Sequence, residues 1–271
     1  MKHSPRNPHF MKNFLLNTVC FLTVCSAAHS QGYHLGLAVS PNYSFSDARE
    51  LSHTANGGQV HFGYGFIFDA LFTETYAIGT GVNIFYNGGR VLYFEDVATS
   101  EGTMIHRVEL ENKQQYVEVP LTFKMRTKEI GYSTFYGQFG VGLGLNVRSE
   151  GMRRSSSFAV TDSLGQWSFI QEEGAGDPAR VSLVDQTLLF RPSMIIGFGF
   201  ERRFTGTTAL VVGLRYNLAL RNQYQLFPVY KTQTGDEVMF EFNEILGAEQ
   251  PEQVEMSGKT GQIELCVGIM F

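Results

Sequence analysis

The chain has 271 residues, of which 43% are hydrophobic and 13% aromatic, and its 26 acidic residues outnumber its 21 basic ones. This acidic balance disfavours a nucleic-acid binder, because affinity for nucleic acid comes largely from basic contacts to phosphates. Two of the three cysteines precede residue 31, so Cys266 is left alone and neither an internal disulfide nor a cysteine zinc site is expected. The sequence contains no apolar run of 18 residues, the length that indicates a membrane-spanning helix.

The N-terminus has the pattern of a secretory signal peptide. Three basic residues and no acid precede the apolar residues 14–25, and small residues follow. This order predicts a signal peptide over residues 1–30 and a mature chain that begins near Gln31. Both Met1 and Met11 fit as the start codon. Removal of the signal leaves 18 basic and 26 acidic residues, a net charge of −8.

Period-two alternation dominates the mature sequence, with apolar side chains on one face and small or polar ones on the other. Such alternation predicts β-strands. The predicted strands have about ten residues or more, which suits a tilted strand that crosses a bilayer, whereas strands of ordinary globular proteins have about five or six. In chain order they are residues 33–45, 60–70, 76–86, 117–125, 135–147, 188–200, 210–220 and 263–271.

The gaps between these strands alternate in length. Long gaps are expected at 46–58, 88–113, 149–185 and 222–260, and short ones at 71–75, 127–132 and 202–207. Bacterial outer-membrane barrels have short periplasmic turns and long extracellular loops. Residues 31–271 are therefore expected to form one all-β domain, an eight-stranded antiparallel transmembrane up-and-down β-barrel in the cell outer membrane, with outer-membrane lipid as its surroundings.

Charged side chains on the small or polar face are expected to point into the barrel lumen. They are Glu118, Lys124, Arg126, Arg148, Arg191, Glu201, Arg215, Arg221 and Glu264. The interior of an eight-stranded barrel is just wide enough for side chains to fill, so these residues are expected to pair and plug it. An anion site built from Arg191, Arg215 and Arg221 is the alternative. Arginine at the outward Leu143 is expected to impair assembly, whereas serine at the inward Gly142 is expected to be tolerated.

Catalytic and cofactor sites are not indicated by the sequence. Only His53 and His106 with Asp96 and Asp162 offer material for catalysis in the outer loops, and they show neither a nucleophile nor metal-ligand spacing. The glycines from Gly140 to Gly144 continue the inner face of a strand, so they do not fit a dinucleotide loop, which requires a following helix. We expect no enzyme activity, no cofactor or metal, and no small-molecule substrate.

Residues 114–145 resemble a known family. The Y-x-E-x-P-L-x-x-K core, followed by a short turn and a glycine-rich strand, resembles the PorT-like outer-membrane barrels of the Bacteroidetes, and the turn is most similar to the PorT branch. The motif residues are Tyr116, Glu118, Pro120, Leu121, Lys124 and Gly131. The resemblance implies a non-enzymatic accessory of type IX protein secretion whose partners are other secretion-system proteins. A stand-alone surface barrel for adhesion or structural anchoring, and a small channel, remain alternatives.

Overall fold

The structure is a computed structural model that describes residues 32–48, 53–99, 102–161, 167–169, 176–225, 228–230 and 253–271. The predicted signal peptide over residues 1–30 lies outside these residues. No helix in the described ranges is long and apolar enough to cross a membrane.

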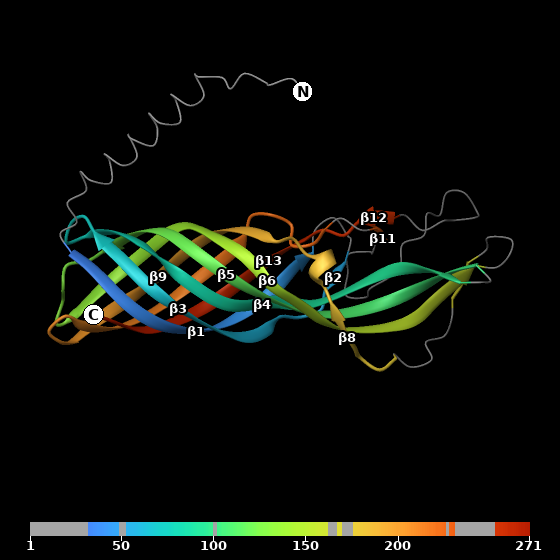
Figure 1. Ribbon diagram of the computed structural model, residues 1–271, viewed down its shortest axis with the longest axis horizontal. Helices are drawn as coiled ribbons and strands as arrows, with labels where there is room; N and C mark the ends of the chain where they lie inside the picture. Colours follow the sequence, from blue (N-terminus) through green and yellow to red (C-terminus); the bar gives the residue numbers. More distant parts are fainter. Residues whose placement is uncertain are drawn as a thin grey trace, which may run out of the picture.

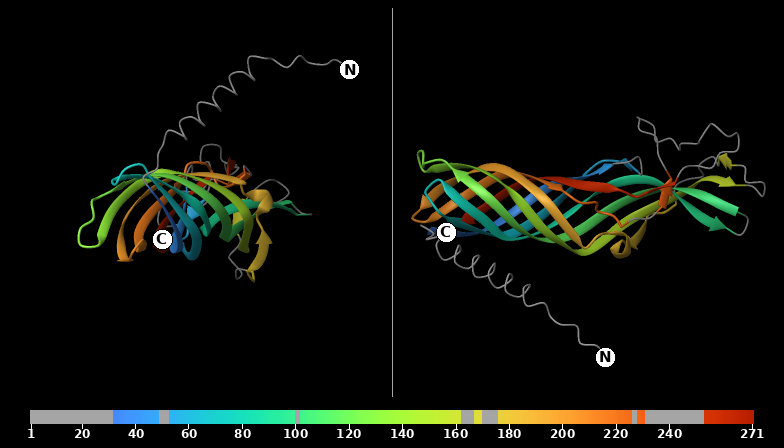
Figure 2. Two further views of the ribbon diagram at one scale, coloured as in Figure 1. Left: turned by 60° about the vertical axis from the view of Figure 1, so that its left-hand side comes forward. Right: turned by 90° about the horizontal axis from the view of Figure 1, so that it is seen from above.

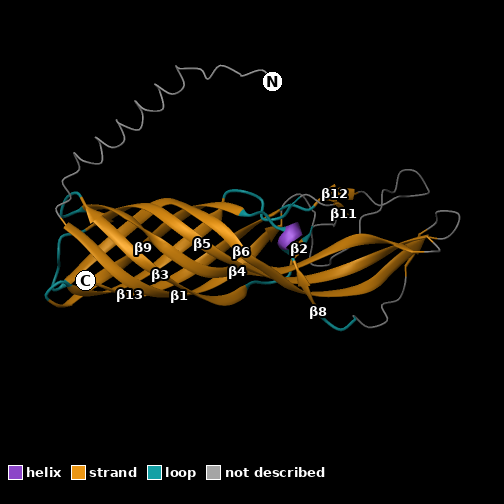
Figure 3. Ribbon diagram, in the orientation of Figure 1, coloured by secondary structure: helices purple, strands orange, loops and turns teal. Residues whose placement is uncertain are grey.

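Eight long strands in the described part of the chain close into an antiparallel barrel, as the sequence predicts (Figures 1 and 3). Neighbours in sequence pair with one another, and the last strand pairs with the first. The strands are β1 (Gly32–Ala48), β3 (Gln59–Leu71), β4 (Tyr76–Thr99), β5 (Gly102–Arg126), β6 (Ser133–Thr161), β9 (Phe190–Thr205), β10 (Thr208–Ala219) and β13 (Gly258–Met270).

The barrel is sealed where its two terminal strands meet. The backbone N–H of Phe271 donates to the carbonyl of Leu35 at 2.8 Å, and the N–H of Leu35 donates back to Phe271 at 3.1 Å. Both ends of the barrel chain therefore lie at the same end of the molecule, together with the short turns. This is the periplasmic end in outer-membrane barrels.

Short turns join the strands at this end, in the predicted places. In the turn after β3, the Thr73 hydroxyl accepts hydrogen bonds from the backbone N–H groups of Thr75 and Tyr76. In the turn after β5, Gly131 has a φ of 56° and Tyr132 a φ of 69°. Glycine reaches this left-handed region at no steric cost. The family-motif glycine is thus explained by the backbone of the turn.

Burial follows the predicted alternation along the strands. Phe198 is 65% exposed and Leu143 is 49% exposed, whereas Ser193 on the inner face is fully buried. A continuous apolar belt therefore covers the outside of the barrel, while glycines and polar side chains fill the inside. Tyr33, Tyr132 and Phe204 are exposed near the short turns, where aromatic side chains favour the membrane interface.

The prediction of a loop at 88–113 is wrong. Strand β4 continues to Thr99 and β5 begins at Gly102, and their residues pair in unbroken register from Asn83–Glu118 to Thr99–Gly102. Strand β6 likewise runs to Thr161, past the predicted end at 147. These three strands project beyond the barrel as a sheet, called the β4–β5–β6 extension below, at the end opposite the C-terminus (Figures 1 and 2).

The extension forms because apolar residues continue in the strands past the membrane. On β5, Val108 and Leu110 alternate with charged residues, whereas the β4 run from Val91 to Phe94 is apolar throughout. Val91, Tyr93, Val108 and Leu110 are at most 2% exposed. They belong to an apolar cluster that does not face lipid.

Short elements complete the end of the molecule that carries the extension, within the other expected long gaps. Strand β2 (Thr54–Ala55) and β11 (Pro228–Tyr230) pair with β4, whereas β7 (Trp167–Phe169) and β8 (Ala179–Ser182) pair with β6. Strand β12 (Gln253–Glu255) pairs with β11, and the 3-10 helix η1 (Val184–Gln186) follows β8.

Serine at Gly142 is expected to strain the lumen, contrary to the expectation from the sequence. A Cβ atom there would lie 2.4 Å from Ser193 Oγ and 2.5 Å from Glu118 Oε2. At Gly144, by contrast, the nearest atom to an added Cβ is the Arg191 carbonyl oxygen, at 3.2 Å. Gly144 is therefore the better inward position for comparison.

Substitution of the outward Leu143 by arginine should destabilise the folded barrel by roughly 2–4 kcal/mol if the residue lies near the bilayer midplane, because a charge would then face hydrocarbon. The measurement is urea unfolding in lipid vesicles, with heat-modifiable gel mobility as the test of folding. Leu143→Met and Gly144→Ala serve as controls and should change the free energy of unfolding by less than about 1.5 kcal/mol. Equal loss in all three variants would contradict the assigned faces.

Candidate functional site

A chain of ion pairs fills the lumen towards the periplasmic end. Lys124 on β5 contacts Asp69 on β3, and its Nζ lies 3.3 Å from Glu201 Oε1 on β9. Arg126 binds the other oxygen of Glu201. The Lys124 ammonium also lies 4.4 Å from the centroid of the Tyr136 ring. One lysine thus joins three strands across the interior.

A second group of polar contacts is centred on Arg191. Its Nη1 lies 3.5 Å from Glu118 Oε2 and donates to Asn217 Oδ1 at 3.2 Å. Glu118 in turn accepts hydrogen bonds from Ser193 at 3.0 Å and from Asn217 at 3.2 Å. The guanidinium lies 5.4 Å from the centroid of the Tyr116 ring. These contacts connect β5, β9 and β10 through buried side chains.

The charges of the lumen balance. A further pair, Arg215 with Glu264, joins β10 to β13 at 2.5 Å. The four acids and four bases that form the described lumen ion pairs are Asp69, Glu118, Glu201, Glu264, Lys124, Arg126, Arg191 and Arg215. The cavity beside Lys124 has a volume of only about 30 Å³, about the share of one water in the liquid. This part of the lumen has no room for a hydrated ion.

Asp69 is the lumen residue that the predicted charge set omits. It is 3% exposed and contacts Lys124. Its position on the polar face of residues 60–70 was a sufficient signal, because it follows the same alternation as the predicted charges.

Arg148 and Arg221 do not join this network, contrary to the prediction. A β-bulge lies in β6 where Gln115 and Tyr116 pair with Arg148 and Asn146, leaving Val147 unopposed. A bulge adds one residue and shifts the alternation, so Arg148 is exposed and pairs with Glu150 at 2.7 Å. Arg221 is exposed because it follows the end of β10 at Ala219. An anion site built from Arg191, Arg215 and Arg221 is therefore wrong as well.

The family-motif residues divide between the two faces of the barrel wall. Tyr116 and Glu118 are 1% exposed, and the Tyr116 ring stacks on Phe85 at 5.8 Å. Leu121 faces outward and is 54% exposed. The Pro120 carbonyl accepts a hydrogen bond from the Thr80 hydroxyl at 2.8 Å. The motif thus contributes both to the outer face of the barrel wall and to the packed lumen, and it does not form a surface site.

An apolar cap packs at the end of the lumen next to the extension. Its buried members are Val91, Tyr93, Val108, Leu110, Leu183, Tyr224, Val229 and Met256. The Tyr224 hydroxyl accepts a hydrogen bond from Asn112 at 2.5 Å, and the His53 ring meets the Tyr224 ring edge-on at 6.1 Å. Residues from the segment after β10 therefore pack against β4 and β5.

Between this cap and Arg191 the lumen is lined with amides. Asn42, Asn87 and Gln262 are at most 3% exposed, and both polar atoms of each amide have no hydrogen-bond partner among the described residues. Buried polar groups of this kind bind ordered water in folded proteins. We expect this layer to be hydrated, with the cap on one side and the ion pairs on the other.

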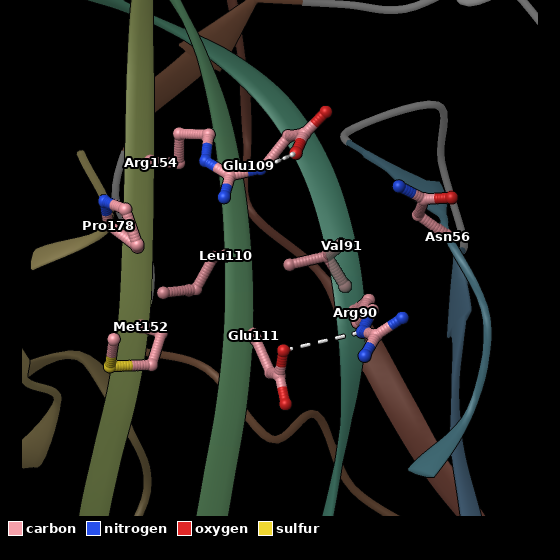
Figure 4. Close-up of a pocket in the computed structure, with 9 residues that line it drawn as sticks. All are labelled: Asn56, Arg90, Val91, Glu109, Leu110, Glu111, Met152, Arg154 and Pro178. Atoms are coloured by element: carbon pink, nitrogen blue, oxygen red, sulfur yellow. Dashed lines mark ion pairs between the residues drawn. The ribbon is translucent and has the colours of Figure 1, made fainter. Parts of the chain in front are cut away.

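A cavity of about 320 Å³ lies on the other face of the extension (Figure 4). Two ion pairs border it: Arg90 Nε lies 3.3 Å from Glu111 Oε2, and Arg154 Nη1 lies 3.7 Å from Glu109 Oε2. The side chains of Val91 and Leu110 lie at the height between the two pairs in the figure. The cavity is charge-balanced and open to solvent, so it offers a surface for contact but no isolated charge for a ligand.

The histidines considered for catalysis are not brought together. His53 lies in the cap, whereas His106 lies on β5 opposite Glu95. Asp96 is opposite Ile105, and Asp162 lies outside the described residues. No group of three or more His, Cys, Asp or Glu side chains with metal-binding geometry occurs in the described ranges.

Burial lowers the pKa of His53 to about 4 against the partly compensating charge of Asp47. Since the unfolded chain binds a proton near pH 6.5, stability should fall as the pH drops from about 6.5 to about 4, by at most ~1.4 kcal/mol per unit. Above pH 6.5 this contribution should be constant. Across this range the urea midpoint of the wild type should fall relative to that of His53→Leu, which has no titrating group at this site; parallel curves would show that folding does not lower the pKa of His53.

Removal of one partner of the buried Arg191–Glu118 pair should strongly lower the free energy of unfolding. Arg191→Met leaves the Glu118 carboxylate buried without its charge partner and should cost roughly 3–5 kcal/mol. The double variant Arg191→Met/Glu118→Gln should recover part of this loss. Arg148→Met, which breaks an exposed pair, should cost about 0–1 kcal/mol. Urea unfolding in vesicles measures all three, and similar costs at Arg191 and Arg148 would mean that the plug carries no special stability.

Several solved structures of outer-membrane proteins are similar to this chain. Neisserial surface protein A is 10% identical with a TM-score of 0.37, over 89% of this chain and 96% of that one. OprG from Pseudomonas aeruginosa is 11% identical with a TM-score of 0.41, over 90% and 98%. The outer membrane protease OmpT from Escherichia coli is 8% identical with a TM-score of 0.31, over 90% and 97%. At these identities and TM-scores, nothing is inferred from these structures about the present chain. No curated protein matches the sequence.

The family comparison is more direct. A model described as "Outer membrane protein beta-barrel domain" matches residues 28–225, which is well over half of the chain. The predicted location in the cell outer membrane is thereby confirmed. With its closed barrel, apolar outer belt and filled polar lumen, the chain belongs to this family of outer-membrane β-barrel proteins.

Proposed function

We propose that the protein is a non-enzymatic, non-conducting outer-membrane scaffold that holds the β4–β5–β6 extension outside the cell for contacts with other proteins. The main observation behind this proposal is the extension itself. Its paired strands continue beyond the barrel and pack a buried apolar cluster of their own. A sheet stabilised in this way presents the same surface at all times, as a docking surface requires. The balanced ion pairs of the lumen support a structural role for the barrel itself.

The finer proposal is an accessory role in type IX protein secretion, with other secretion-system proteins as partners. It is supported by the resemblance of residues 114–145 to the PorT branch, and within that motif by the turn glycine Gly131 with its φ of 56°. The alternating charges of Arg90, Glu109 and Glu111 on the extension suit a polar, reversible protein contact.

Adhesion or structural anchoring is the second candidate. It is favoured by the same extension, because a sheet that projects from the outer surface is placed to meet another cell or matrix (Figure 1). A channel is disfavoured by the 30 Å³ cavity beside Lys124. The secretion role and the adhesion role predict different losses when the extension is shortened.

Shortening the extension tests the proposal. Residues 95–106 would be replaced by an Asn-Gly turn, which suits a two-residue hairpin, and Arg90, Glu109 and Glu111 by serine, so that both the tip and the charged surface are removed. The change joins β4 to β5 beyond the paired residues Phe94 and Arg107 and keeps the apolar cluster. The control is Arg180→Ala, a single change at an exposed site on β8. Heat-modifiable mobility and surface labelling would establish that both variants reach the membrane folded.

The secretion role predicts that the shortened variant loses type IX cargo from the medium to the level of a deletion strain, while the control secretes normally. Adhesion instead predicts normal secretion with reduced attachment to surfaces. Normal secretion together with normal attachment would overturn the scaffold proposal in both forms.

A further inference from the structure

An apolar groove of about 870 Å³ runs along the outside of the barrel. It crosses β4, β3, β1, β13 and β10, which are consecutive in the wall. Leu37, Val39, Phe66, Val82, Ile269 and Phe271 are exposed along it. Because this wall faces hydrocarbon, the groove is a place where lipid chains can be held in a fixed position.

The groove reaches the periplasmic edge of the membrane. It extends along β13 from Val267 to Phe271, which is four steps or about 14 Å at ~3.4 Å per residue. On β4 it reaches Ile84, towards the middle of the bilayer. Phe271 lies at the end with the short turns, so a lipid of the periplasmic leaflet has access to the groove there.

A cationic side chain lies beside the groove at the membrane edge. Arg202 on β9 continues the outward alternation of Phe198 and Phe200, and its cross-strand partner is Leu210, which lines the groove. Cross-strand partners have Cβ atoms about 4.5–5.5 Å apart. Arg202 is exposed and forms no ion pair within the described part of the chain, whereas the neighbouring Arg203 pairs with Glu129.

The apolar groove and the cationic Arg202 together fit a molecule with an anionic head and apolar chains. The stem of an arginine at the interface packs on apolar surface while its guanidinium remains in water, and a guanidinium binds phosphate oxygens in a bidentate manner. An anionic head next to apolar chains is the chemistry of a phospholipid. A second copy of the chain would bring the same unpaired cation to the contact, because a two-fold interface is made from identical patches.

We infer that the groove and Arg202 form a binding site for a glycerophospholipid of the periplasmic leaflet. The acyl chains lie over Leu37, Val39 and Ile269, and the phosphate binds the Arg202 guanidinium. This inference does not rest on the proposed scaffold function, because it concerns the opposite end of the molecule.

The test uses the folded protein in vesicles made of equal parts of dioleoyl phosphatidylethanolamine and dioleoyl phosphatidylglycerol. After extraction into detergent, native mass spectrometry counts the phospholipids that remain bound. The wild type should retain one phospholipid. Arg202→Ala should reduce its affinity roughly tenfold or more, as expected for the loss of a charged hydrogen bond, and Arg202→Lys should restore part of it.

The groove is tested by filling it. Val39→Trp places a large side chain in the groove and should reduce lipid retention, whereas Ile196→Trp on β9, outside the groove, should not. Arg180→Ala controls for the change in net charge. Heat-modifiable mobility excludes variants that fail to fold, and Arg202→Ala, at an exposed residue near the end of β9, keeps the test valid if the tryptophan variants are lost.

Reduced retention in both Arg202→Ala and Val39→Trp, with unchanged controls, is the expected result. Retention that is equal in all folded variants, or absent from the wild type, would overturn the inference. A protein dimer without retained lipid, lost on Val39→Trp, would also overturn it and assign the groove to a second copy of the chain.

Discussion

Hydrocarbon offers no hydrogen-bond partner to a peptide group, and this constraint governs the molecule. Every backbone N–H and C=O in the membrane must find a partner within the protein, so a sheet that crosses must close on itself. Here the closing contact is the β1–β13 pair, fixed by the exchange of hydrogen bonds between Leu35 and Phe271. Once the sheet is closed, each strand has an outer face for lipid and an inner face that must satisfy itself.

The inner face resolves a second problem, the narrowness of an eight-stranded barrel. Charges that cannot reach water must pair, and the desolvation cost of a lone buried ion is several kcal/mol. Lys124 bridges Asp69 and Glu201, while Arg191 bridges Glu118 and Asn217. These pairs leave the barrel filled, while the β4–β5–β6 extension beyond the membrane has an apolar cluster of its own.

Alternation along the sequence was enough to predict the barrel, the outward face and seven members of the lumen network. Besides Asp69 and Arg221, it missed two features for physical reasons. The bulge at Val147 inverts the alternation, so Arg148 moves to the surface, and nothing in the local sequence marks the bulge. Tyr93 and Val108 fall in a predicted loop because they lie beyond the expected membrane strands, but they face a separate cluster.

The central claim is that the folded barrel is closed and filled, and single-channel recording in planar bilayers tests it most directly. Because the described lumen charges are paired and the cavity beside Lys124 holds about 30 Å³, the folded wild-type protein should show no steady conductance under conditions in which a known porin opens. Persistent, reproducible openings from the folded protein would contradict the account, since they would require a water-filled path through the ion pairs.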